Sequence, residues 1–177
     1  MLKLSFAWKK SKDKSYCLKR LVKCMNEIGR KMNVLCEIAH ALNKENVTWV
    51  VGASLLLYLK GIVNDFHDID ILVLEEDVPK FKQVFSKFGY LLPSNFNSKY
   101  KTKYFLEYIV DNVEIDVIGG YIITNNGIDY DCSLSKDQIN DKVVINNELI
   151  PLHSLSLWKK YYKLMERSEK VNLLKDY

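Results

Sequence analysis

Apolar residues recur at steps of three and four between Ser15 and Leu42, which is the period of an amphipathic helix. The recurring positions are Leu18, Leu21, Val22, Met25, Ile28, Met32, Leu35, Ile38 and Leu42. Lysines lie between them and are expected on the opposite face. The pattern predicts one long helix, or two shorter ones, followed by a polar break at 43–46.

Short apolar runs separated by glycines and polar turns then replace this pattern. Val47–Val51 is β-branched and aromatic and Ile69–Leu74 is aliphatic, so both are predicted to be buried strands. A short Leu-rich helix is expected between them over Ser54–Lys60, ended by Gly61.

The rest of the chain predicts a further helix, several short strands and a helical end. Asp77 is expected to cap the helix that contains Pro79 in its first turn. Residues 102–110 and 113–118 alternate in polarity on either side of Asp111-Asn112, as a β-hairpin does. The remaining expected elements are turns at 125–127 and 146–147, a helix from Leu152 onward and a short helix at 171–174.

This order of elements predicts the α+β class, with a small mixed β-sheet flanked by helices. We expect a basic helical segment at 1–46, a core at 47–151 and a helical tail at 152–177 that packs on the core. A chain of 177 residues, 48% hydrophobic and 12% aromatic, excludes a disordered or fibrous protein. It carries no apolar run of roughly 20 residues and no secretory signal, so we expect a soluble, cytoplasmic protein.

The net charge of +4 conceals an uneven distribution, because residues 1–31 hold ten Lys or Arg against two acids. Such a segment either binds a polyanion such as RNA or forms the solvated face of a helix, and the lack of interleaved aromatic residues favours the solvated face. The four cysteines contain no Cys-x-x-Cys pair and the three histidines are scattered, which favours reduced thiols over a zinc site.

Two aspartates, Asp68 and Asp70, stand at the start of the second predicted strand. The two-residue period of a strand points both side chains to one face of the sheet, and Ile69 and Ile71 to the other. Carboxylates about 6–7 Å apart repel each other and are costly to bury together. A divalent cation such as Mg²⁺ removes that conflict, because it neutralises both and accepts oxygen ligands.

A third acid, Asp116, is flanked by Ile115 and Val117 on the strand after the predicted hairpin turn. If this strand lies beside the Asp68–Asp70 strand, Asp116 reaches the same metal site, whereas Glu114 lies further along the same face. Three carboxylates suit either a two-metal site or one metal with a general base.

The turn Gly52-Ala53-Ser54 joins the first predicted strand to its helix. Glycine permits a tight turn, and Ser54 is expected to cap the helix, whose N-terminal N–H groups suit a phosphate. Gly-Ala-Ser is a weak signal alone and becomes stronger when followed by the Asp68–Asp70 pair and Asp116.

These residues together resemble the polymerase-β-type nucleotidyltransferase superfamily, whose signature is an apolar-Gly-(Gly/Ser) turn, an Asp-x-Asp strand and a later single Asp. The antibiotic-modifying aminoglycoside and lincosamide nucleotidyltransferases are the nearest in size, and the similarity spans about residues 47–176. The resemblance implies transfer of a nucleoside monophosphate from an NTP, such as ATP, to an acceptor hydroxyl, with release of pyrophosphate.

The resemblance also implies a role for each matching residue. Asp68 and Asp70 would hold Mg²⁺, or Mn²⁺, against the triphosphate, and Asp116 would ligate a second ion or act as the base. Gly52, Ala53 and Ser54 would form the nucleotide-binding turn, of which Gly52 and Ser54 contact the β- and γ-phosphates.

This chain departs from the family pattern at three positions. Ala53 stands where Gly or Ser is commoner, and Asn64 and Phe66 stand where many relatives carry Arg and Thr. The charge of the missing Arg could be supplied by other cations, namely Lys60, Lys159 or Lys163.

Each candidate also has a purely structural interpretation. The Asp68–Asp70 pair could be a strand edge without a ligand, Asp116 could form a surface ion pair, and Ser54 could be only a helix cap. His67 is expected to be neither ligand nor base. Trp158, Tyr161 and Tyr162 could stack on a base or sugar, but their helical spacing favours the core.

Three hypotheses for the function remain open. The first, which we favour, is an enzyme acting on a small hydroxylated acceptor such as an antibiotic. The second is a toxin-type enzyme acting on tRNA or other RNA ends, supported by the basic segment at 1–31. The third is a catalytically inactive relative that binds a nucleotide or a partner, to which Ala53, Asn64 and Phe66 would point.

Overall fold

A computed structural model describes residues 11–93 and 101–177, with side chains at residue 22 and from residue 25 onward. The helices are α1 (Ser11–Lys44), α2 (Ala53–Leu59), α3 (Val78–Phe85), α4 (Leu155–Leu164) and α5 (Ser168–Leu173), with 3-10 turns η1 (Glu75–Asp77) and η2 (Lys136–Gln138). The strands are β1 (Trp49–Val51), β2 (Ile69–Val73), β3 (Tyr90–Leu91), β4 (Tyr104–Val110), β5 (Val113–Gly119), β6 (Ile122–Asn125), β7 (Ile128–Asp131), β8 (Asp141–Ile145) and β9 (Glu148–Leu152).

Seven strands form one mixed sheet in the order β3-β4-β5-β2-β1-β9-β8, and β6 and β7 form a separate two-stranded sheet. Two pairs of neighbours, β2–β5 and β1–β9, are parallel, and the other pairs of the large sheet are antiparallel. The predicted α+β class with a mixed sheet is therefore confirmed.

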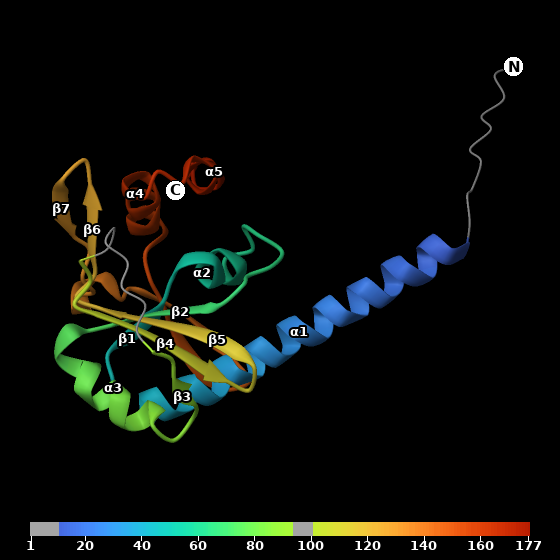
Figure 1. Ribbon diagram of the computed structural model, residues 1–177, viewed down its shortest axis with the longest axis horizontal. Helices are drawn as coiled ribbons and strands as arrows, with labels where there is room; N and C mark the ends of the chain where they lie inside the picture. Colours follow the sequence, from blue (N-terminus) through green and yellow to red (C-terminus); the bar gives the residue numbers. More distant parts are fainter. Residues whose placement is uncertain (1–10, 94–100) are drawn as a thin grey trace, which may run out of the picture.

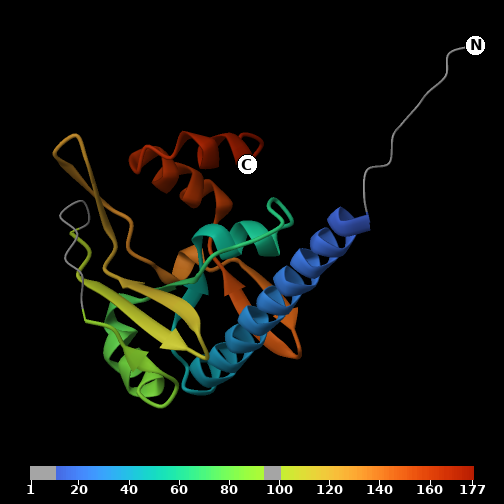
Figure 2. The same cartoon turned by 45° about the vertical axis from the view of Figure 1, so that its right-hand side comes forward.

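Helices cover both faces of the large sheet. In Figures 1 and 2, α1 and α3 lie on one face, while α2 and the C-terminal pair α4–α5 lie on the other. The N-terminal part of α1 extends beyond the sheet in both views. The C-terminal pair follows β9 directly in the chain. Between them, the N–H of His153 donates to the carbonyl of Val51 on β1. The two helices therefore start at the end of β9, beside β1 and one strand from the edge strand β8.

The C-terminal half of α1 packs on the sheet as the periodicity predicts, with Leu35, Ile38 and Leu42 fully buried. Val22 and Met25 of the predicted stripe are instead exposed, because that part of α1 extends beyond the sheet. The segment forms one helix rather than two. Lys31 contradicts the expectation that lysines lie on the outer face, because only 7% of it is exposed. Its ammonium is stable there because it donates to the carbonyl of Phe66 at 2.7 Å and lies 3.6 Å from Glu27.

The predicted hairpin turn at Asp111-Asn112 is confirmed, and both residues have positive φ, as a tight two-residue β-turn requires. Strand β3 was not predicted, because it has only two residues, both exposed, and so shows no alternation of apolar and polar positions. Over the described ranges, no helix combines the length and apolarity needed to cross a membrane. Cys36 and Cys132 are buried free thiols, whereas the side chains of Cys17 and Cys24 lie outside the described part.

Candidate active site

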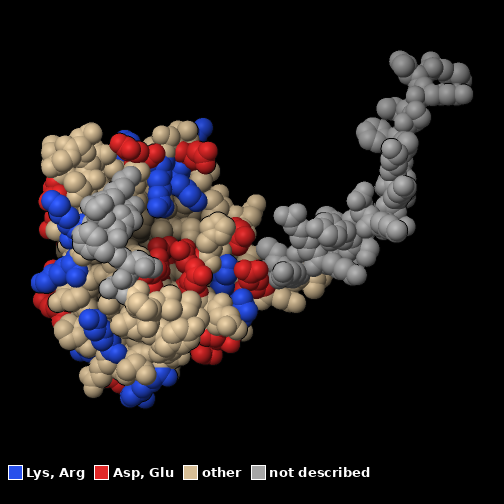
Figure 3. Space-filling model, in the orientation of Figure 1, with Lys and Arg blue, Asp and Glu red and all other residues tan. Residues whose placement is uncertain are grey.

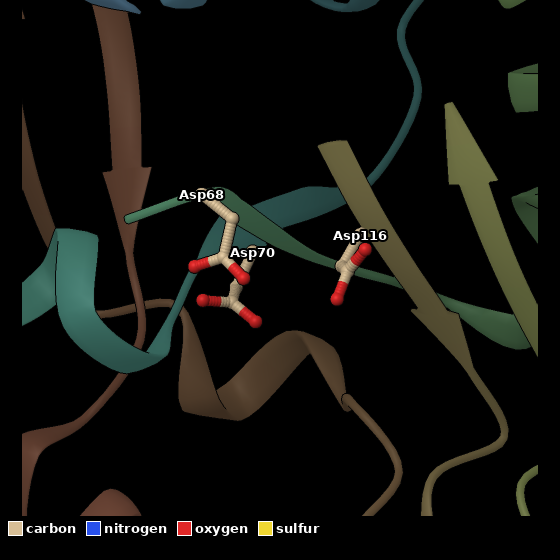
Figure 4. Close-up of side chains that lie close together, drawn as sticks. All are labelled: Asp68, Asp70 and Asp116. Carbon is tan, nitrogen blue, oxygen red and sulfur yellow. The ribbon is translucent and has the colours of Figure 1, made fainter. Parts of the chain in front are cut away.

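Three aspartates converge on one point of the sheet. Asp70 on β2 is the direct partner of Asp116 on the parallel neighbour β5, and Asp68 immediately precedes β2. One carboxylate oxygen from each lies within 4.8 Å of the others, and Figure 4 shows the three side chains pointing into the same space. Ile69 and Ile71 point to the opposite face and are fully buried.

Two of the three carboxyl groups, those of Asp70 and Asp116, resist ionisation. Burial, followed by the charges of Asp68 and Asp116, raises the pKa of Asp70 well above its usual range. Burial and then Asp68, with smaller effects of two glutamates, raise the pKa of Asp116 to about 7. Oxygen donors at this spacing fit a hard divalent cation, because such an ion neutralises the repulsion that adds to the effect of burial on these pKa values.

Glu107 extends this row of acids to a third strand and was not singled out from the sequence. It lies on β4 directly opposite Asp116, so that Glu107, Asp116 and Asp70 follow one another across the sheet. Glu114 is exposed, and both glutamates act on Asp116 through their charge. The hairpin register could have revealed Glu107, since residues 107 and 116 are equally far from the turn at 111–112.

The Gly52 turn lies beside the aspartates. The Gly52 N–H donates to the carbonyl of Asp70 at 3.0 Å, which joins the turn to the strand that carries the acids. Ser54 does not cap α2, contrary to the prediction: Gly52 is the N-cap, without any side-chain hydrogen bond, because the helix already begins at Ala53. Ala53 has φ +42°, a left-handed conformation that is strained for a residue with a Cβ.

Trp158 on α4 packs against this turn. A Cβ placed on Gly52 would lie 2.3 Å from Cζ2 and 2.9 Å from Nε1 of the indole ring. Within the described part of the chain, neither Nε1 of Trp158 nor Oγ of Ser54 has a hydrogen-bond partner, although both are buried. Buried polar atoms without partners are rare, and these two lie at the turn that the sequence predicts to bind the nucleotide. The rest of the Trp158 side chain is core, as are Tyr161 and Tyr162.

The cations proposed from the sequence largely face elsewhere. Lys60 pairs with Asp141, and Lys159 donates to the backbone carbonyls of Lys175 and Tyr177, each at 2.9 Å. Lys163 is exposed on the last turn of α4. Arg167, between α4 and α5, is the cation whose charge lowers the pKa of Asp70, and sequence analysis missed it.

The positions that depart from the family pattern offer little to a phosphate. Phe66 is buried, with its ring 5.0 Å from that of Tyr58, and Asn64 is exposed. His67 is also exposed. Positive charge is present elsewhere on this face of the molecule. In Figure 3, acidic side chains gather in a recess, and basic side chains over the C-terminal helices border it. Opposite charges thus face each other across the candidate site.

The model of the aminoglycoside-2''-adenylyltransferase family matches residues 34–172 of the chain. A solved structure similar to this chain is a putative nucleotidyltransferase, TM1012 from Thermotoga maritima, with 27% identity and a TM-score of 0.67. The similarity covers 84% of this chain and 92% of that one. No curated protein sequence matches the chain.

Two antibiotic-modifying enzymes share the fold at lower identity. ANT(2'')-Ia, solved in complex with adenylyl-2''-tobramycin, has 11% identity and a TM-score of 0.55 over 80% of this chain and 86% of that one. The lincosamide antibiotic adenylyltransferase LnuA, solved with lincomycin bound, has 15% identity and a TM-score of 0.51. The similarity covers 81% of this chain and 95% of LnuA.

Proposed function

Because the chain belongs to the aminoglycoside-2''-adenylyltransferase family and is a nucleotidyltransferase, we propose that it transfers a nucleoside monophosphate from Mg²⁺-bound NTP to a hydroxyl of a small, antibiotic-like molecule. The observation that carries the proposal is the convergence of Asp68, Asp70 and Asp116 beside the Gly52 turn. NTPs are abundant in the cytoplasm, which fits the cytoplasmic location that the sequence suggests.

Each residue of the site has a proposed role. Asp68 and Asp70 hold Mg²⁺, and Asp116 holds a second ion or takes the proton of the acceptor hydroxyl. Divalent ions bound there would neutralise charge on the attacking and leaving oxygens. The Gly52-Ala53-Ser54 turn binds the nucleotide, and Gly52 and Ser54 contact its β- and γ-phosphates. Ser54 Oγ would then gain a hydrogen-bond partner, which it does not have within the described part of the chain. The acceptor oxygen forms its bond to the α-phosphorus as the bond to the pyrophosphate oxygen breaks.

The acids beyond Asp116 favour a particular class of acceptor. Glu107 adds negative charge on the side of Asp116 away from Asp70, and Glu114 adds it two residues before Asp116 on β5. That charge suits a small molecule carrying amines as well as hydroxyls. The adenylyl-tobramycin complex of ANT(2'')-Ia and the lincomycin complex of LnuA are consistent with an antibiotic acceptor.

The proposal is tested by incubating the protein with each labelled NTP, Mg²⁺ and a panel of hydroxylated antibiotics, with total tRNA in a parallel reaction. Label is expected on a small molecule with the wild type and not with Asp68→Asn. Asp111→Asn is the matched control, because Asp111 is exposed in the hairpin turn, away from the triad. Transfer by Asp68→Asn at the wild-type rate would remove Asp68 from the mechanism.

A second candidate, transfer to RNA ends, is favoured by the excess of eight positive charges in residues 1–31. Label would then move to tRNA and decline steeply with salt, because phosphate contacts release counterions. Absence of any NTP·Mg²⁺ binding would instead favour a catalytically inactive relative. We further propose a division of the chain into three segments. The core at 47–151 carries the catalytic residues, the segment at 1–46 is a basic helix, and the tail at 152–177 packs on the core.

A further inference from the structure

We infer that Glu107 on β4 is the general base that takes the proton of the acceptor hydroxyl, which leaves Asp116 to bind metal together with Asp68 and Asp70. The inference rests on the proposed function and decides between the two roles that it leaves open to Asp116. The register of β4, the face to which Glu107 points and its surroundings support this role.

Glu107 is the direct neighbour of Asp116 on the adjacent strand. The two residues lie opposite each other in the antiparallel β4–β5 pair, and Asp116 in turn lies opposite Asp70 in the parallel β2–β5 pair. Side chains of directly opposed residues extend from the same face of a sheet, with Cβ atoms about 4.5–5.5 Å apart. The carboxyl group of Glu107 is therefore within a side chain's length of that of Asp116.

The packing of Tyr108 fixes the face of the sheet to which Glu107 points. The Tyr108 ring lies against α3, with its centroid 4.9 Å from that of Phe85 and 6.3 Å from that of Phe81. Helix α3 covers the face opposite to α2 and α4 in Figures 1 and 2. Because successive side chains of a strand point to opposite faces, Glu107 points away from α3, toward the side of α2 and α4.

The carboxyl group of Glu107 is half-buried and has no cation to pair with in the described ranges 11–93 and 101–177. The two described lysines that lie just before β4 are both engaged elsewhere. Lys101 pairs with Asp129, and Lys103 pairs with Glu75. A partly desolvated carboxyl group without a counter-charge contributes nothing to stability, whereas a base requires a free lone pair.

The aspartates are better suited to hold metal than to accept a proton. They form the one group among the described residues whose oxygens all lie close enough to share an ion, and Glu107 is not a member of it. A cation favours the ionised form of the carboxyl groups that it binds, so their oxygens become weaker bases. The base is then best supplied by a carboxyl group that adjoins the ligands without being one of them, as Glu107 does.

The proposed step is balanced within the acceptor, the NTP and Glu107. The proton of the acceptor hydroxyl moves to a carboxylate oxygen of Glu107 as the acceptor oxygen forms its bond to the α-phosphorus. The bond from the α-phosphorus to the bridging oxygen breaks, and pyrophosphate leaves with the electron pair. Since Glu107 is only half-buried, its proton can then pass to water.

The test measures two properties of the full chain and its variants. The first is kcat for transfer from labelled NTP at saturating acceptor, beginning with tobramycin and lincomycin. The second is the affinity for Mn²⁺ and for NTP·Mg²⁺, by calorimetric titration. Glu107→Gln is expected to lower kcat roughly a hundred- to ten-thousandfold, the contribution of a general base, while each affinity changes by no more than about fivefold.

Three further variants make the test specific. Asp116→Asn should lower Mn²⁺ affinity at least about tenfold, as loss of a ligand requires. Glu114→Gln removes an equal charge near Asp116 from an exposed position, and its loss of kcat should be at least about tenfold smaller than that of Glu107→Gln. Sodium formate should restore part of the rate to Glu107→Ala, because it supplies the missing carboxylate.

The outcomes separate the inference from the proposed function. If the wild type labels none of the small molecules, the proposed function fails and the inference with it. If the wild type is active, the inference alone is overturned when Glu107→Gln keeps kcat within about tenfold, when Glu114→Gln loses as much, or when formate restores nothing. Loss of Mn²⁺ affinity by Glu107→Gln equal to that of Asp116→Asn would make Glu107 a metal ligand and would also overturn it.

Discussion

The indole ring of Trp158 occupies the space that a side chain at Gly52 would need. The glycine belongs to the turn before α2 and the tryptophan to α4, so this contact joins the core to the C-terminal tail. It explains on packing grounds why the turn carries a glycine here, since the φ of −130° is open to any residue.

Gly52→Ala is expected to destabilise the protein by about 1–3 kcal/mol, the usual range for overpacking, because the new methyl group would displace the indole ring. NTP binding should weaken as well, since the ring carries one donor of the turn. Urea unfolding and NTP titration measure the two effects. Gly29→Ala is the control: nothing lies within 4 Å of a Cβ there, and alanine favours the helix. Equal stability of both variants would contradict this account of Gly52.

Removing one member of the triad should abolish catalysis without unfolding the protein. Asp70→Asn and Asp116→Asn are each expected to lower the transfer rate at least about a hundredfold, the scale seen when one electrostatic contact to a transition state is lost. Removing metal with EDTA should have the same effect, and Mg²⁺ or Mn²⁺ should restore the wild type alone. Rates with saturating NTP and a reactive acceptor provide the measurement. Activity that persists in EDTA would argue against a metal-dependent reaction.

The stability of the metal-free protein should fall as the pH rises from about 4 to 7. Over this interval folded Asp116, with a pKa of about 7, keeps a proton that the unfolded chain, with a pKa near 3.8, has already released. Folding is therefore favoured at the acidic end, and the advantage is lost as pH rises through 7. Thermal unfolding at several pH values checks this expectation.

The same experiment has two internal controls. Asp116→Asn should flatten the decline, and its melting temperature at pH 8 should exceed that of the wild type by a few degrees, because one repelling charge is gone. Saturating Mg²⁺ should also flatten the decline in the wild type, since binding favours the ionised carboxylates. An identical slope in wild type and Asp116→Asn would show that other groups set the pH dependence.

Lys31 joins α1 to the loop just before the acids, because its ammonium donates to the carbonyl of Phe66. Lys31→Met is expected to cost about 1–3 kcal/mol, the range for a buried carbonyl left without its donor. Mn²⁺ affinity should fall modestly, as Phe66 is two residues from Asp68. Arg30→Met, on the exposed side of α1, is the control. Chemical unfolding and Mn²⁺ titration of both variants distinguish the anchor from a general charge effect.

Regular alternation explains why much of the fold and the triad could be predicted. The two-residue period fixed the face of Asp68 and Asp70, and the register of β2 with β5 then brought Asp116 alongside. Arg167 could not be found in this way, because an exposed residue in a turn between two helices belongs to no periodic pattern. Its effect on the pKa of Asp70 depends on how α4–α5 folds back over the sheet, which is a tertiary relationship.

Local propensity was misleading where tertiary contacts decide the conformation. Serine is a good N-cap, yet α2 starts one residue before Ser54, because the carbonyl of Gly52 already accepts the first helical hydrogen bond, from the N–H of Leu56. Lysine is usually exposed, yet Lys31 is buried because a carbonyl from a distant loop satisfies its ammonium. The partner of Lys31 lies 35 residues away in the sequence, so no local pattern could have indicated that this lysine is buried.

The hydrogen bond from Gly52 to Asp70, together with the pairing of Asp70 with Asp116, joins the Gly52 turn and the aspartates in one hydrogen-bonded floor. Such a floor has little freedom to reshape itself around different molecules. Changes confined to the final two helices therefore offer a route by which descendants of this chain could acquire new acceptors while they keep the same cluster of aspartates.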